Sequence, residues 1–253
     1  MRKVLLAFAL AAVAIFMISG AASAITYGEA DGDRHPEVGA LVETSDGETY
    51  PYCSGTLISR TVFLTAAHCD IGKKHVRVTF DEKYSPGSTL YTGTFHASPF
   101  FPDATNDPYD IAVVVFDEPV NGIDPARLPA RNRFEDLPKD QRFTSVGYGS
   151  QEVTNAPGGH QFVYENAREY SVGTLNALTS SYLRISQNPA TGNGGTCYGD
   201  SGGPNFLGAG PSETNIVAST TITGDAFCKS TNVTYRLDTR SARAFLRDYV
   251  KLP

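Results

Sequence analysis

The sequence predicts an all-β protein, built as a sandwich or as barrels and followed by one short helix. Two observations support this class. Short runs rich in β-branched and aromatic residues recur along the chain, and turn residues separate them. The 253 residues include 24 Gly and 15 Pro, a composition that suits many short strands better than long helices. Length alone does not decide between one large unit and two small domains.

The expected elements follow one another from residue 39 to the C-terminus. The predicted strands are residues 39–42, 55–58, 61–64, 75–80, 111–116, 142–146, 182–185 and 215–223. Residues 121–138, with three prolines and mixed charges, are expected to connect two halves of the chain. An amphipathic helix is predicted within residues 239–250, because apolar residues recur there at helical spacing: Ala242, Phe245, Leu246, Tyr249 and Val250.

Residues 1–24 have the pattern of a cleaved secretory signal. Arg2 and Lys3 precede an apolar run over residues 4–18, and small residues follow at 22–24. An uncleaved membrane anchor is the alternative, because this run is close to the shortest length that spans a bilayer. We expect cleavage and secretion, to the medium or the periplasm, with no membrane contact afterwards.

The charge of the chain argues against one class of partner. The net charge is −6 at pH 7, and the acidic residues are dispersed rather than gathered in a tail. A protein with this balance is repelled by nucleic acid, which we therefore do not expect as a partner. The histidines other than His68 show no ligand spacing, and we expect no metal site.

The four cysteines are expected to form two disulfides in an exported protein. Three connectivities are possible, and the spacing does not choose among them. Free or metal-bound thiols are the alternative, which the absence of any C-x-x-C pair disfavours.

The stretch from Cys197 to Pro204, CYGDSGGP, joins a potential nucleophile to several glycines. The hydroxyl of Ser201 is a poor nucleophile unless a base and an orienting carboxylate act on it. His68, which ends an apolar segment, and Asp110, which precedes a β-branched run, are the candidates for these roles. The chain order of this predicted triad is His68, Asp110, Ser201.

This order separates the chain from two other folds that build the same triad. Residues 199–203 fit the G-x-S-x-G pattern of α/β-hydrolases, whose histidine follows the serine, but no histidine lies beyond His160 here. A subtilisin-like protease needs an aspartate first, which Asp46 could supply before His68 and Ser201. The residues that flank these positions argue against that alternative.

Four blocks resemble the chymotrypsin/trypsin family of serine endopeptidases, in particular its secreted bacterial members. They are CSGTLIS at 53–59, AAHC at 66–69, DIA at 110–112 and GDSGGP at 199–204. The resemblance covers nearly all of the chain after residue 24. It implies two antiparallel six-stranded β-barrels, at about residues 25–128 and 129–238, and a C-terminal helix at about 239–250. His68 and Asp110 would come from the first barrel and Ser201 from the second.

The resemblance also assigns roles to residues around the triad. It pairs Cys53 with Cys69 and Cys197 with Cys228. It gives the N–H groups of Gly199 and Ser201 the role of an oxyanion hole, and it pairs the buried Asp200 with a newly exposed N-terminal ammonium. Because Ile25 directly follows Ala24, we hypothesise that the cut that removes the signal also releases this ammonium.

Substrate preference is predicted from positions that the family uses as pocket walls. Gly195, six residues before Ser201, stands where trypsin-like members carry an aspartate for Lys or Arg. Aligning residues 219–221 with the substrate-binding strand makes Thr221 and Val233 the walls of the pocket. This resembles elastase-like members, so a small apolar residue is our first expectation and a medium apolar or aromatic one the second. An extended peptide would pair with residues 219–221 by strand addition.

The predicted function is that of a secreted serine endopeptidase that hydrolyses polypeptides through an acyl-enzyme. We expect it to need no cofactor, to act as a monomer and to be a target for a proteinaceous inhibitor. A catalytically silent binding protein on the same fold and a secreted esterase with the same triad are the alternatives, since fold alone does not fix function.

Overall fold

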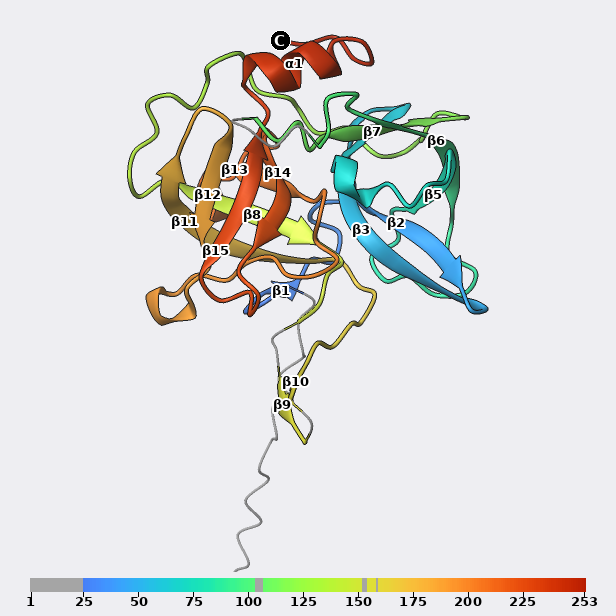
Figure 1. Cartoon of the computed structure of the whole chain (residues 1–253), viewed down its shortest axis with the longest axis horizontal. Coiled ribbons are helices and arrows are strands. Elements are labelled where there is room, and N and C mark those ends of the chain that lie inside the picture. Colours follow the sequence, from blue (N-terminus) through green and yellow to red (C-terminus); the bar gives the residue numbers. More distant parts are fainter. Residues whose placement is uncertain (1–24, 103–106, 152–153, 158) are drawn as a thin grey trace, which may run out of the picture.

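The structure, a computed structural model, describes residues 25–102, 107–151, 154–157 and 159–253. Two closed, six-stranded antiparallel β-barrels lie side by side, and one α-helix follows them at the C-terminal end (Figure 1). The predicted all-β class with two barrels and a C-terminal helix is therefore confirmed. The signal-like residues 1–24 lie outside the described residues.

The first barrel closes in the strand order β2-β3-β4-β7-β6-β5. Pairing of β2 with β5, for example of Leu41 with Val78, completes the ring. Its strands are β2 (Val38–Ser45), β3 (Glu48–Ser59), β4 (Val62–Thr65), β5 (His75–Thr79), β6 (Tyr91–Ala97) and β7 (Ala112–Phe116).

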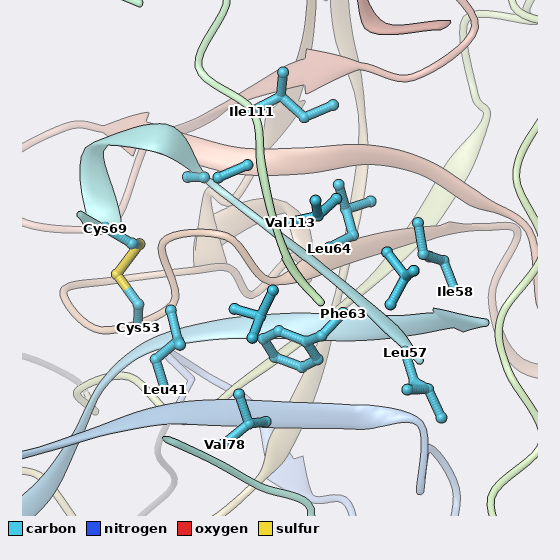
Figure 2. Close-up of a cluster of buried hydrophobic side chains, with 14 of the residues drawn as sticks. Leu41, Cys53, Leu57, Ile58, Phe63, Leu64, Cys69, Val78, Ile111 and Val113 are labelled. Carbon is cyan, nitrogen blue, oxygen red and sulfur yellow. A yellow bond between two sulfur atoms is a disulfide. The ribbon is translucent and has the colours of Figure 1, made fainter. Parts of the chain in front are cut away.

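Apolar side chains fill the first barrel. Leu41, Leu57 and Val78 converge on the ring of Phe63 from three strands (Figure 2). Gly55 allows β3 to approach this ring, because a Cβ at that position would lie 2.4 Å from the carbonyl oxygen of Leu64 and from the Phe63 ring. The packing leaves a rigid scaffold whose rim carries the residues that follow β4 and precede β7.

The second barrel closes in the order β8-β11-β12-β15-β14-β13, and β1 adds to the outer edge of β11. Its elements are β1 (Glu29–Ala30), β8 (Arg142–Gly147), β11 (Glu169–Leu178), β12 (Tyr182–Ser186), β13 (Pro204–Leu207), β14 (Val217–Gly224) and β15 (Thr231–Arg236). The hairpin of β9 (Thr154–Ala156) and β10 (Gly159–Gln161) extends away from both barrels (Figure 1). Short 3-10 turns are η1 (Ala67–Cys69), η2 (Pro189–Thr191) and η3 (Gly210–Ser212).

The N-terminal arm differs from the boundaries predicted for the barrels. Residues 25–37 were expected in the first barrel, but Glu29 pairs with Tyr170 of β11 and Thr26 pairs with Gly195. The arm therefore lies on the second barrel before the chain enters β2. The segment between β7 and β8 spans residues 117–141 and contains the predicted connector 121–138.

The C-terminal helix α1 (Arg240–Leu246) is shorter than the predicted range of 239–250. Thr239 caps its start, because its hydroxyl accepts a hydrogen bond from the N–H of Ala242 at 3.2 Å. Ala242 and Leu246 are buried, and Phe245 and Tyr249 pack against the main hydrophobic cluster. The predicted apolar face is thus correct, although the regular helix ends at Leu246. No helix in the described part of the chain is long and apolar enough to cross a membrane.

Candidate active site

Ser201 lies at the junction of the two barrels, in the loop between Cys197 and β13. Its carbonyl oxygen accepts a hydrogen bond from the N–H of Ser54 on β3 at 2.8 Å. The next residue, Gly202, has φ of +83°, and a Cβ there would lie 2.1 Å from the Thr65 hydroxyl and 2.4 Å from the Ser54 carbonyl oxygen. Only glycine fits this contact. The serine loop therefore rests directly on the first barrel.

His68 lies in η1, immediately after β4. The disulfide Cys53–Cys69 ties this turn to β3 (Figure 2). Cys69 Sγ also lies 3.7 Å from the carbonyl oxygen of Ser201. The backbone that carries the imidazole is thus fixed to its own barrel and lies against the serine loop.

Asp110 orients His68 through both of its carboxylate oxygens. Oδ1 accepts a hydrogen bond from the His68 backbone N–H at 3.0 Å, and Oδ2 lies 2.7 Å from His68 Nδ1. Asp110 is buried, whereas the His68 side chain is 32% exposed. Because an ionised carboxylate only accepts, Nδ1 is the donor in this pair and Nε2 of the neutral ring is left as an acceptor. The structure brings these two predicted residues together.

His68 and Ser201 share one cavity of about 360 Å³. Its other walls come from the serine loop, the end of β14 and the loop that follows: Thr196, Cys197, Tyr198, Thr221, Ile222, Thr223, Gly224, Asp225 and Cys228. The disulfide Cys197–Cys228 joins two of these walls. Both disulfide pairings expected from the resemblance are therefore present.

The predicted oxyanion donors lie beside this cavity. Gly199 has φ of +98°, a conformation that glycine adopts without strain. Neither its N–H nor that of Ser201 donates a hydrogen bond within the described residues. Donors in a turn of this kind are free to bind an oxygen atom of a ligand.

Asp200 is completely buried next to this loop. Its Oδ1 accepts from the N–H of Gly149 at 2.8 Å, and its Oδ2 accepts from the N–H of Cys197 at 2.7 Å. Burial raises the pKa of Asp200 to about 8, the negative charge of Glu169 acts in the same direction, and the two N–H groups oppose the rise. Its carboxylate therefore fixes the start of the serine loop.

The backbone N–H of Ile25 donates to Glu169 Oε2 at 3.2 Å. The resemblance pairs Asp200 with the ammonium that a cut before Ile25 would release, and for the cut chain that pairing stays a prediction. Glu169 was not singled out from the sequence. Nothing in its neighbours marks it, and only the pairing of β11 with β8 shows where it lies.

Two of the three predicted pocket residues are not on the cavity wall. Gly195 is buried, pairs with Thr26, and faces Gln187, whose Oε1 would lie 2.0 Å from a Cβ on Gly195. Val233 packs against the main hydrophobic cluster. Thr221 does line the cavity.

Residues 219–221, predicted to pair with a peptide, are not accessible in the structure. Ser219 and Thr220 are fully buried, and both backbone groups of Thr221 are engaged, its N–H with the Gly203 carbonyl and its carbonyl with the Gly202 N–H. These residues cannot pair with an added strand. Thr223 and Gly224 are exposed and line the cavity, so they replace residues 219–221 as the accessible edge.

Asp225 is a cavity residue that the sequence did not single out. Partial burial acts to raise its pKa, but N–H groups of Thr231, Lys229 and Ser230 outweigh this and lower it. Its Oδ1 accepts from Ser230 and Thr231 at 2.8 and 2.9 Å, and its Oδ2 accepts from Lys229 at 3.1 Å. The carboxylate thereby organises the loop that forms the cavity wall.

One group of three side chains among the described residues has metal-ligand proximity: His68, Cys53 and Cys69. The two cysteines are joined in a disulfide and offer no thiolates. This group therefore does not fit a metal ion.

The chain matches the family described as Trypsin over residues 29–244. It is 31% identical to snake venom serine protease KN8 of Trimeresurus stejnegeri over 164 residues, which are 60% of this chain and 62% of that protein. It is 28% identical to a chymotrypsin of Phaedon cochleariae over 199 residues, 74% of this chain and 68% of the relative. A trypsin of Saccharopolyspora erythraea is 26% identical over 187 residues, 70% and 78% of the two chains. The matched region thus spans less than two thirds of the venom protease, but the family match covers most of this chain, which belongs to the trypsin family of serine proteases.

Proposed function

We propose that this protein is a secreted serine endopeptidase that hydrolyses polypeptides through an acyl-enzyme. The observation that carries the proposal is the 2.7 Å contact between His68 Nδ1 and Asp110 Oδ2, beside a cavity that His68 shares with Ser201. Family membership supports the peptidase class.

In this mechanism His68 Nε2 takes the proton of the Ser201 hydroxyl as the oxygen attacks the peptide carbonyl. Asp110 holds the imidazole in the tautomer with the proton on Nδ1 and stabilises the imidazolium that forms. His68 then gives the proton to the leaving amine, and water repeats the sequence to release the acid.

The N–H groups of Gly199 and Ser201 would stabilise the oxyanion of each tetrahedral intermediate. Donors of this kind are worth about 10² to 10³ in turnover each, because they are oriented before the charge develops. Ser54, Gly202 and Asp200 support this geometry by fixing both ends of the loop.

We propose a preference for a small or medium apolar residue before the scissile bond. This preference is supported by the side chains of Thr196, Thr221 and Ile222, which form much of the cavity wall. Asp225 adds negative charge there, but backbone N–H groups already occupy its carboxylate oxygens. The exposed edge at Thr223 and Gly224 would pair with the substrate backbone.

The proposal also includes export of the protein. Residues 1–24 would be removed as a signal, and the cut before Ile25 would release the mature N-terminus. Two disulfides suit an oxidising compartment.

The test compares the exported protein with Ser201→Ala on a peptide library. We expect the substitution to lower kcat by about 10⁶, as loss of the nucleophile does in such triads. A folded protein that cleaves neither peptides nor esters favours a binding protein, and one that cleaves only esters favours an esterase. Circular dichroism on both proteins controls for folding.

A further inference from the structure

Two buried carboxylates share one face of the second barrel beside the N-terminal arm. Glu169 on β11 is the cross-strand partner of Gly147 on β8. Gly147 has no side chain, and Asp200 Oδ1 occupies the space, 2.2 Å from where a Cβ of Gly147 would lie. Directly opposed residues in a sheet have Cβ atoms about 5 Å apart. The Glu169 side chain therefore emerges beside the Asp200 carboxylate.

The nitrogen of Ile25 lies at the same place. It is 3.2 Å from Glu169 Oε2, and the Ile25 side chain is fully buried. The following residue is fixed independently, because Thr26 exchanges two backbone hydrogen bonds with Gly195 and its hydroxyl contacts the Cys228 carbonyl oxygen at 3.0 Å. A cut before Ile25 would leave this nitrogen in position, because none of these bonds depends on what precedes it.

The charge balance changes when that cut is made. A peptide N–H donates one hydrogen bond and carries no charge, so it cannot neutralise either carboxylate. An α-ammonium carries a full positive charge and three donors. The pKa of Asp200 stands at about 8 in the uncut chain, first because of burial and further because of the charge on Glu169. An ammonium bound by both carboxylates would offset the repulsion between their negative charges and favour their ionised forms.

We propose that Glu169 is a positioning residue that binds the α-ammonium of Ile25 together with Asp200 once the chain is cut between Ala24 and Ile25. This rests on the maturation step of the proposed function. Glu169 acts through Asp200, whose contacts with Gly149 and Cys197 fix the start of the serine loop. Among the described residues, Glu169 from β11 contacts the nitrogen, and Asp200 from the serine loop lies close enough for the charge on Glu169 to raise its pKa.

Neighbouring charges on the same strand are directed elsewhere. Arg168 donates to Asp31 at 2.7 Å, and Tyr170 donates to Glu29. Both residues flank Glu169 and point to the opposite face of β11. The pH dependence of the ammonium site is therefore expected to follow Glu169 and Asp200.

The test measures the amine directly. A chain that starts at Ile25 is released in vitro from an N-terminal fusion, in the Ser201→Ala background, and acetic anhydride labelling of its α-amino group is followed by mass spectrometry against pH. We expect Glu169→Gln to label about tenfold faster than the parent near pH 8, which corresponds to a fall of one unit in the pKa of the amine. Asp200→Asn should show a similar gain. Glu165→Gln is the matched control and should label like the parent, because the Glu165 side chain is 39% exposed and pairs with Lys83.

Equal labelling of Glu169→Gln and the parent, with faster labelling of Asp200→Asn, would overturn the proposal. If the Gln variant does not fold, the same labelling is measured on Glu169→Asp, because the shorter side chain places its carboxylate farther from the nitrogen. Several-fold faster labelling supports the proposal, and an unchanged rate opposes it. The result does not require peptidase activity, so it stands apart from a failure of the proposed function.

Activity supplies a second readout when Ser201 is present. The amine pair is complete below the usual amine pKa of about 8 and is lost as pH rises through its raised value. Glu169→Gln is expected to move the alkaline limb of kcat/KM to lower pH and to leave the acidic limb in place. A uniform loss at every pH would indicate a merely structural role and count against the proposal.

Discussion

The two barrels have the same closed six-stranded topology but different interiors. The first contains a cluster of rings, with Phe63, Phe80, Tyr91 and Phe116 at centroid distances of 5.5 to 6.2 Å. The second contains amides and hydroxyls around the fully buried Asn205, which binds Ser145, Thr221 and Asn232. A smaller apolar cluster lies around Phe134 and Phe143, and the main cluster also reaches the second barrel through Phe206, Val217 and Tyr235.

This difference in interior parallels the residues that each barrel contributes to the candidate site. The first barrel holds His68 and Asp110 at its rim, each beside a residue of its apolar core, Cys69 and Ile111 (Figure 2). The second barrel forms the cavity wall, and Thr221 belongs to both the wall and the hydrogen-bonded interior. Apolar packing supports the segments that carry His68 and Asp110, whereas directional hydrogen bonds support the cavity wall at Thr221.

The largest expected effect comes from breaking the apolar interior. Phe63→Ala should lower the free energy of unfolding by about 3–5 kcal/mol, because it removes a fully buried ring and leaves a cavity. Urea unfolding measures it, and Phe100→Ala, at a side chain that is 63% exposed, is the control with little expected change. A loss below about 1 kcal/mol would show that the ring cluster is not what holds the first barrel.

The second effect concerns a buried charge network on the second barrel. His35 stacks on Phe206 with ring centroids 5.1 Å apart, and its two ring nitrogens bind Asp31 and Glu213. Burial opposes the charged form, but the hydrogen bonds that the ring donates to Asp31 and Glu213 prevail and raise the pKa of His35 to about 9. The imidazolium is therefore the stable form in the folded protein at neutral pH.

Because the pKa of His35 is raised on folding, its stabilisation is complete below the unfolded value of about 6.5 and is lost as pH rises through about 9. We expect a loss on the order of 3 kcal/mol across this window in unfolding free energy measured against pH. His35→Gln should flatten this part of the profile, and His75→Gln, at an exposed position, should not. Identical profiles for the parent and His35→Gln would contradict the role of the network.

The comparison of the barrels also explains which strands could be predicted from the sequence. All eight predicted runs lie in or against observed strands, and five of them build the apolar first barrel. The overlooked barrel strands are β6 of the first barrel and β11, β13 and β15 of the second. In β15 the buried positions include Asn232 and Thr234, so the alternation of apolar and polar residues is missing. Where the buried side chains of a strand are polar, the sequence lacks the apolar and polar alternation from which a strand is predicted.

The residues of the candidate site also differ in how far the sequence could predict them. Chain order and flanking residues select His68, Asp110 and Ser201 as candidates, because each stands in a short motif. The structure places His68 against Asp110 and beside the same cavity as Ser201. Gly195 and Val233 were assigned by alignment to the family, and the structure places both away from the cavity wall. The pairing of Ile25 with Asp200 concerns the cut chain and stays a prediction. Glu169 and Asp225 depend on strand register and loop closure, which bring together residues far apart in the chain.

The smallest expected effect comes from the polar interior and is the sharpest test of the comparison. Asn205→Ala removes hydrogen bonds of 2.6, 3.0 and 3.1 Å to Ser145, Asn232 and Thr221, and should lower the free energy of unfolding by about 1–3 kcal/mol. It should also raise KM several-fold, because Thr221 loses its support at the cavity wall, whereas Phe63→Ala should leave KM unchanged while the protein stays folded. Asn176→Ala, at an exposed position, is the control for both measurements. An Asn205→Ala protein with unchanged KM would show that the interior of the second barrel stabilises the fold without shaping the cavity.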